Sequence, residues 1–273
     1  MDLFKFARRL PADKNKPTVV TLTGGMGAQI ISAAIYFSMK NAGCPVYADL
    51  SYFDKPESVA AVGNAGVLSH WSWQLEPFGL FPASFDAAKG LAKRSADILQ
   101  DGPQKLELGL NAMMQPEVQK YFGIPVGVED ILPGEFAEDF LCMHVRRGDY
   151  VNVATHLIAD GEFISLAGKF SGLVKSAVVI SDSPISTDFR NAVSSCFKKA
   201  LFLDNTDAYT AHRLMRCARI LICSNSQFSL IAAALNPNAL VLIPKQWYGD
   251  KQRYIEAPLH ARCSFQIMEN SGA

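Results

Sequence analysis

The sequence LCMHVRRGDY at residues 141–150 joins an apolar run to two adjacent arginines. The run Leu141–Val145 has the length and composition of a buried β-strand. Arg146 and Arg147 follow it directly, and paired guanidinium groups suit phosphate oxygens because each can donate two parallel hydrogen bonds. The alternative is a surface pair of arginines with Asp149 as the salt-bridge partner, so the rest of the chain has to decide between the two.

Apolar runs alternate with helix-like segments throughout the second half of the chain. The expected strands are Phe140–Val145, Ala177–Ile180, Leu201–Leu203, Ile220–Cys223 and Ala239–Ile243. The expected helices are residues 162–175, Ile185–Phe197, Ala208–Ala218 and Gln227–Leu235. This alternation predicts an α/β fold in which helices cover both faces of a parallel sheet.

The first half of the chain opens with a unit of the same kind. Thr18–Thr23 predicts a strand, residues 28–41 a helix and Val46–Ala48 a second strand. Together they form a βαβ unit. Residues 51–133 show little clean periodicity, and we make no detailed prediction there.

Glycines break the chain between the first predicted strand and helix. Gly25 and Gly27 let the backbone of this turn come close to a sugar or a phosphate group. With Asp49 they also resemble a dinucleotide-binding fingerprint, but Ile30 stands where that fingerprint needs a small residue. An NAD-dependent oxidoreductase is therefore the less favoured alternative.

Length and composition suit a globular protein of two domains. The chain has 273 residues, of which 49% are hydrophobic and 19% charged. We place the domain boundary within the stretch 125–138, which gives domains of residues 1–135 and 136–273. The 26 basic and 26 acidic residues balance, which argues against a nucleic-acid partner. Six cysteines without a close metal-type pair indicate reduced thiols of a cytosolic protein, and no apolar run has the length of a membrane span.

The N-terminal segment carries a basic helical pattern. Residues 1–16 combine five basic side chains with an apolar face of Leu3, Phe6 and Leu10. Such a helix can rest on an anionic membrane surface, and we favour the alternative of a terminal helix packed on its own domain. The expected location is therefore the cytoplasm. If the helix does rest on a membrane, we expect weak contact with the inner face of that membrane.

Polar residues follow the predicted strands of the second half. Because the carboxyl ends of parallel strands meet at one edge of the sheet, ligands bind there. Serine hydroxyls and the free N–H groups of a first helical turn can bind an anion. The residues in question are Arg146, Arg147 and Asp149, then Ser181, Asp182 and Ser183, then Asp204 and Asn205, then Ser224, Asn225 and Ser226. We therefore predict an anion-binding site at this edge.

An ordered set of motifs resembles the bacterial α-1,2-fucosyltransferases, glycosyltransferase family eleven. The motifs are GGMGAQ at 24–29, HVRRGDYV at 144–151, SDS at 181–183, SNSQFS at 224–229, LNPN at 235–238 and IPKQWY at 243–248. Each motif is weak alone, and the ordered set is fairly specific. The resemblance covers residues 18–49 and about 138–250.

This resemblance implies a fold and a reaction. The fold is a pair of Rossmann-like domains that face each other across a cleft, the GT-B arrangement, with the acceptor sugar on the N-terminal domain and GDP-fucose on the C-terminal domain. The reaction moves fucose with inversion to a galactoside-type acceptor, as an α-1,2 linkage, in the synthesis of a surface glycan such as lipopolysaccharide or capsule. Such enzymes need no metal, and the chain has no DxD-type pair after a strand to hold one on a diphosphate.

The resemblance also suggests roles for single residues. Arg147 or Arg146 neutralises the β-phosphate of the leaving GDP, His144 lies near the nucleotide, and Ser226 completes the phosphate site. If the extended geometry persists, the two arginines point to opposite faces, so that one grips the diphosphate while the other braces the loop through Asp149. We favour Arg147 as the gripping residue. The full predicted donor-binding set is His144, Arg146, Arg147, Asp149, Ser181, Asp182, Ser224, Asn225, Ser226, Gly25 and Gly27.

The catalytic base is not fixed by any motif. His156 and Asp160 follow the arginines and have suitable side chains, although each can equally be an exposed polar residue of a loop. With Arg146 and Arg147 they make up the predicted catalytic set. Trp71 and Trp73 can stack on a sugar or pack in a core.

The chain departs from the family pattern at several positions. Ala28 replaces the asparagine of the glycine-rich motif, Ala211 replaces an aspartate, and Leu230 and Ile231 replace two tryptophans. These changes keep open a second function class, a nucleotide-sugar-binding protein without catalysis.

Overall fold

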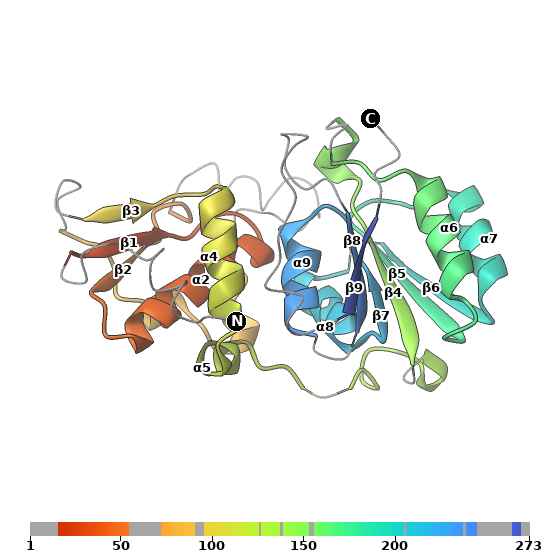
Figure 1. The fold of residues 1–273 in the computed structure, drawn as a ribbon, viewed down its shortest axis with the longest axis horizontal. Coiled ribbons are helices and arrows are strands. Elements are labelled where there is room, and N and C mark those ends of the chain that lie inside the picture. The colour runs from red at the N-terminus through yellow and green to blue at the C-terminus, as the bar shows by residue number, and fades with distance from the viewer. Residues whose placement is uncertain are drawn as a thin grey trace. The chain divides into compact units, whose positions relative to one another are not determined.

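The computed structural model describes residues 16–54, 72–90, 96–125, 127–136, 139–152, 156–204, 206–236, 239–244 and 264–268. The chain divides into two compact units, Met1–Ile124 and Pro125–Ala273. Each unit is built on its own parallel sheet (Figure 1). The predicted N-terminal basic helix lies outside the described residues, apart from Lys16. No helix in the described ranges is both long and apolar enough to cross a bilayer.

The two units divide between Ile124 and Pro125, at the start of the stretch 125–138 in which the sequence suggests a domain boundary. The guanidinium of Arg213 donates to both carboxylate oxygens of Asp130, at 2.8 and 2.9 Å. It also donates to the carbonyl oxygen of Gly127, at 3.2 Å. Because Arg213 belongs to a helix of the second unit, these bonds tie the segment after Ile124 to that unit.

The N-terminal unit contains a three-stranded sheet in the order β2-β1-β3. Its strands are β1 (Thr18–Thr21), β2 (Val46–Asp49) and β3 (Asp97–Leu99). Its helices are α2 (Met26–Asn41), α4 (Pro103–Met113) and α5 (Pro116–Gln119), with short 3-10 turns η1 (Glu76–Phe78), η2 (Pro82–Ser84) and η3 (Lys120–Phe122). The predicted βαβ unit is thus present, although α2 starts two residues early because Gly25, in an extended conformation, forms its N-cap.

The C-terminal unit contains a six-stranded parallel sheet in the order β6-β5-β4-β7-β8-β9. Its strands are β4 (Phe140–Val145), β5 (Ser176–Ser181), β6 (Lys199–Asp204), β7 (Ile220–Ile222), β8 (Leu240–Pro244) and β9 (Ser264–Met268). Its helices are α6 (Asp160–Phe170), α7 (Thr187–Cys196), α8 (Ala208–Cys217) and α9 (Gln227–Ala234), with 3-10 turns η4 (Gly134–Phe136) and η5 (Gly148–Asn152). Helices α6 and α7 cover one face of the sheet, and α8 and α9 cover the other (Figure 1).

Most predicted element bounds agree with the structure to within a few residues. The largest difference is the helix expected at 162–175, which ends at Phe170. There Leu173 donates its N–H to the carbonyl oxygen of Phe170, and the Ser171 hydroxyl donates to that of Gly168. These bonds close the helix in a turn.

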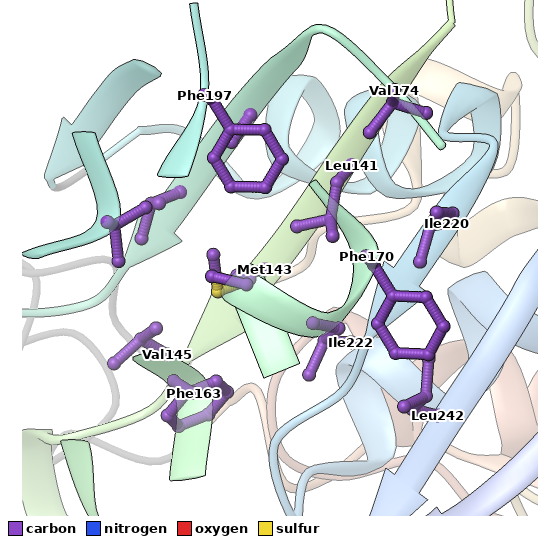
Figure 2. Packing of buried hydrophobic residues seen from close by; sticks show 14 of the residues in the cluster. Leu141, Met143, Val145, Phe163, Phe170, Val174, Phe197, Ile220, Ile222 and Leu242 are labelled. Atoms are coloured by element: carbon purple, nitrogen blue, oxygen red, sulfur yellow. The ribbon is translucent and has the colours of Figure 1, made fainter. Parts of the chain in front are cut away.

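Strand β4 is buried on both faces, as expected for a central parallel strand. Its alternate residues Leu141, Met143 and Val145 share one core cluster with Phe163 and Phe170 of α6 (Figure 2). Phe163 is fully buried, and burial of such a side chain contributes about 1.5–3 kcal/mol. This packing fixes the direction of β4 and therefore the position of Arg146 and Arg147, which follow it.

Two glycines in helix interiors give a test of this packing. A Cβ atom on Gly109 of α4 would lie 2.4 Å from Ile31 Cγ2 of α2, whereas one on Gly168 of α6 would meet only Cys196 Sγ, at 4.0 Å. Gly109→Ala should lower the free energy of unfolding by about 1–3 kcal/mol through overpacking. Gly168→Ala should raise it by up to about 1 kcal/mol through helix propensity. Urea denaturation of both variants measures the difference, and equal effects would contradict the close approach of α2 and α4.

Candidate functional site at the carboxyl edge of the C-terminal sheet

The strand order of the C-terminal unit places its switch point between β4 and β7. From β4 the chain builds β5 and β6 on one side, and it then returns to build β7, β8 and β9 on the other. Ligands of open parallel sheets bind beyond the carboxyl ends of the strands at such a point. The segments that leave this point begin with Arg146 after β4 and with Cys223 and Ser224 after β7.

Arg146 is held by a neighbouring strand. Its Nη1 atom forms an ion pair with Asp182 Oδ2 at 2.8 Å, and the two side chains are 15% and 18% exposed. The guanidinium also lies over the ring of Tyr150, 5.2 Å from the ring centroid. Arg146 is therefore held between the Asp182 carboxylate and the Tyr150 ring.

Arg147 has a more open carboxylate partner. Its Nη2 atom pairs with Asp160 Oδ1, on the first turn of α6, and that carboxylate is 51% exposed. Its Nη1 atom donates to the carbonyl oxygen of Arg146 at 3.1 Å, and its guanidinium lies over the Phe163 ring at 5.7 Å. The two arginines thus have different acidic partners, Asp182 for Arg146 and Asp160 for Arg147.

The segment Ser181–Ser183 braces the turn that carries the arginines. Asp182 Oδ1 accepts the backbone N–H of Arg147 at 2.8 Å, and Ser183 Oγ accepts that of Gly148 at 3.1 Å. A Cβ atom on Gly148 would lie 2.5 Å from Asp182 Oδ2, so only glycine fits against this carboxylate. Asp182 and Ser183 are thus occupied with holding the arginine turn.

His144 joins the two strands at the switch point. It is 4% exposed, its Nδ1 atom shares a hydrogen bond of 2.8 Å with Ser224 Oγ, and its ring meets that of Phe228 edge-on at 5.5 Å. Burial, together with the charge of Arg146, lowers the pKa of His144 to about 3. The imidazole is therefore neutral at physiological pH and holds the β7 loop beside the arginine turn.

The loop Ser224–Ser226 leads into α9 and is buried throughout. Ser226 caps the helix, because its Oγ accepts the N–H of Phe228 at 3.3 Å. Ser229 donates its hydroxyl to the carbonyl oxygens of Ser224 and Ser226, both at 3.2 Å. Phe228 and Ser229 escaped the sequence prediction as site residues, although both belong to the SNSQFS motif.

The other predicted site residues are placed less tightly. His156 lies at the surface edge of the arginine segment, where its ring meets that of Tyr150 at 5.3 Å. Asp149 belongs to η5, and its side chain is outside the described atoms. Asp204, at the end of β6, pairs with Arg190 two strands away from β4, and Asn205 is outside the described residues.

Gly25 and Gly27 belong to the N-terminal unit. Gly25 caps α2 and Gly27 lies in its first turn, so both are at the carboxyl end of β1. Trp73 is half-buried and packs edge-on to the rings of Phe53 and Phe85, at 5.4 and 5.5 Å. This placement supports the core reading of Trp73. Trp71 is outside the described residues.

Comparison with known families decides the class of this protein. The model of glycosyl transferase family 11 matches residues 109–260. The chain belongs to glycosyltransferase family 11. It is thus a glycosyltransferase, and the motifs that resemble this family in the sequence do mark it as a member.

Solved structures extend the comparison to the fold. The E. coli heptosyltransferase WaaC with ADP is 12% identical, with 94% of each chain covered and a TM-score of 0.50. The NodZ α-1,6-fucosyltransferase soaked with GDP-fucose is 13% identical over 82% of this chain and 94% of that chain, with a TM-score of 0.43. POFUT1 in complex with GDP-fucose is 12% identical over 96% and 99%, with a TM-score of 0.46. No curated protein matches the sequence.

The expected fold class, α/β with two Rossmann-like domains of the GT-B kind, is confirmed. Within the described residues, no group of three or more histidine, cysteine, aspartate or glutamate side chains is placed to hold a metal ion.

The buried neutral histidine predicts a pH-dependent stability. Because His144 titrates near 3 when folded and near 6.5 when unfolded, the unfolded chain takes up the extra proton, and stability falls as the pH drops from 6.5 towards 3. Between about pH 7 and pH 5 this histidine should cost about 2 kcal/mol. Urea denaturation at the two pH values measures the free energy of unfolding. Between pH 7 and pH 5 this free energy should fall by about 2 kcal/mol less in His144→Asn than in the unmodified protein. His212 is also buried with a lowered pKa, but both proteins contain it, so the difference isolates His144; identical pH slopes would contradict this burial.

Proposed function

We propose that this glycosyltransferase moves fucose from GDP-fucose to a galactoside-type acceptor, with inversion and without a metal ion, to form an α-1,2 linkage in a bacterial surface glycan. The observation that supports it best is the pair of braced arginines next to the capped Ser224–Ser226 loop at one switch point. Inversion and the α-1,2 linkage are parts of the proposal with a separate basis. They rest on the resemblance of the motifs.

The chemistry requires positive charge where the diphosphate leaves. The acceptor oxygen forms a bond to the anomeric carbon, the bond from that carbon to the diphosphate oxygen breaks, and the electron pair leaves on GDP. Fixed donors aimed at the developing charge stabilise such a transition state. In this proposal Arg147 and the N–H groups at the start of α9 take that role.

Arg147 is better suited than Arg146 to grip the diphosphate. Its partner Asp160 is half exposed, and an ion pair of this kind contributes only about 0–1 kcal/mol, so a doubly charged diphosphate can replace it. Arg146 and Asp182 are both shielded from solvent, and Asp182 also holds the Arg147 backbone. The C-terminal unit is then the donor domain and the N-terminal unit the acceptor domain.

The test is transfer from radiolabelled GDP-fucose to β-galactosides with a chelator present, together with a thermal-shift panel of GDP, UDP, CDP, NADH and GDP-fucose. We expect transfer and stabilisation by GDP. Stabilisation by GDP without transfer or donor hydrolysis supports the second function, a binding protein without catalysis, which Ala28 and Ala211 motivate. Stabilisation by NADH and by none of the GDP ligands would contradict a GDP-sugar as the donor.

Substitution of the arginines tests their separate roles. Arg147→Lys keeps the charge but loses the two-pronged contact, and it should lower the transfer rate about 10²–10³-fold while the protein stays folded. Arg146→Lys is the matched comparison, and its loss should be smaller because a lysine ammonium can still pair with Asp182. If both variants keep near-normal turnover and GDP affinity, the motif is structural.

Asp160 is one of two proposed bases, with His156 as the other. If Asp160 takes the acceptor proton, Asp160→Asn should lower transfer about 10²–10⁴-fold while GDP affinity is kept, since the arginine that it pairs with remains. Steady-state kinetics and calorimetric titration with GDP measure the two quantities. Full transfer by this variant would limit Asp160 to holding Arg147, and His156→Gln would then be the variant to examine.

A further inference from the structure

A second polar cluster lies at the carboxyl edge of the N-terminal sheet. Lys105 of α4 is only 3% exposed, and its ammonium donates to Asp101 Oδ1 at 2.8 Å. The same ammonium donates to the carbonyl oxygen of Thr21, the last residue of β1. Thr23 Oγ1 donates to the other carboxylate oxygen, Asp101 Oδ2, at 2.5 Å. The sequence prediction covers neither Asp101 nor Lys105, and their only local signal is an i,i+4 pair of opposite charge.

The position of this cluster is that of a ligand site. In the order β2-β1-β3 the chain leaves β1 for β2 and later returns to the other side of β1 as β3. The switch point of this sheet therefore lies between β1 and β3. Thr23 follows β1 and Asp101 follows β3, so the two side chains meet at that point.

The two charged groups of this cluster, the Lys105 ammonium and the Asp101 carboxylate, differ in their exposure to solvent. Burial opposes the charge on Asp101, but the hydrogen bonds from Lys105 and Thr23 outweigh it and lower the pKa of the carboxyl group. Burial lowers the pKa of Lys105, and Asp101 opposes that change. The Asp101 side chain is nevertheless 62% exposed. A buried ammonium thus holds an ionised carboxylate that faces outward.

A strongly buried lysine is not what packing alone favours. Taking a lysine ammonium out of water costs free energy unless it is paired and hydrogen-bonded, and perturbed ionisable groups gather at functional sites. Burial raises the pKa of the Tyr52 hydroxyl, and the negative charge of Asp101 adds to that rise. The neighbouring turn requires glycine at position 24, since Gly24 has φ +70° and a Cβ atom there would lie 3.2 Å from Ala28 Cβ.

We propose that Asp101, presented by Lys105 and Thr23, binds a hydroxyl group of the acceptor sugar in the N-terminal unit. A carboxylate has about four lone-pair positions, of which Lys105 and Thr23 use one on each oxygen. A sugar hydroxyl can donate a charge-assisted hydrogen bond to those that remain. This inference rests on the proposed transferase function and adds the residue that recognises the acceptor.

The experiment separates acceptor binding from donor chemistry in the full chain. Kinetics with lactose, methyl β-galactoside and N-acetyllactosamine give kcat and KM for the acceptor, and release of fucose to water gives donor hydrolysis. Asp101→Asn should lower the acceptor kcat/KM about 10–100-fold, the range expected for a hydrogen bond to a charged group, chiefly through KM. Donor hydrolysis and thermal stabilisation by GDP should stay within about twofold of the unmodified protein, because they do not use this contact.

Two further variants guard against a purely structural effect. Thr23→Val keeps the carboxylate and removes one of its donors, so it should show a smaller rise in the acceptor KM. Asp97→Asn is the matched control, because Asp97 lies on β3, pairs with Lys16 and is 42% exposed; it should change neither activity.

Several outcomes would overturn the inference. Asp101→Asn with an unchanged acceptor kcat/KM would do so. A parallel loss of acceptor transfer, donor hydrolysis and GDP binding would also overturn it. Such a loss would show that the cluster only stabilises the packing of α4 against β1. Donor hydrolysis by the unmodified protein without saturable transfer to any of the three sugars would also reject it and leave the donor proposal standing. Absence of GDP binding altogether would reject the proposed function itself.

Discussion

The carboxylate of Asp182 is the contact on which the C-terminal unit's candidate site depends. It receives the guanidinium of Arg146 and the backbone N–H of Arg147, both at 2.8 Å. The register of the sheet brings this about, because Val145 pairs with Ser181 and the next residues along each strand therefore meet. Gly148 completes the arrangement by leaving room for the carboxylate. Two like charges can stand side by side here because each has an acidic partner, Asp182 for one and Asp160 for the other.

Each unit pairs basic and acidic side chains at the switch point of its sheet. Both are parallel sheets with a switch point, between β4 and β7 in one unit and between β1 and β3 in the other. The C-terminal point carries guanidinium groups, which suit a diphosphate, and the N-terminal point carries the Asp101 carboxylate, which suits a hydroxyl donor. This difference fits the function proposed above for a member of glycosyltransferase family 11, in which one unit binds a diphosphate and the other a sugar hydroxyl.

Much of the fold follows from the sequence, because a parallel strand buried on both faces reads as a short continuous apolar run. Phe140–Val145 was recognisable for this reason, and so were the polar residues after it. The 3-10 turns η1 and η2 were not, because such short turns and aromatic contacts such as that of Trp73 with Phe85 have no period. The contact of Arg213 with Asp130 could not be predicted either, since it joins residues 83 positions apart in the chain.

The sequence by itself determined the alternation of strands and helices, the ordered motifs of the family, and the polar residues that follow each strand. Only the tertiary structure decided which of these residues meet. Asp182 reaches the arginine turn across 35 positions, Ser224 reaches His144 across 80, and Asp101 reaches Thr23 across 78. Local patterns report the burial of each segment but not the order in which strands pair. It is that order which sets the switch points and therefore selects the partners of each charge.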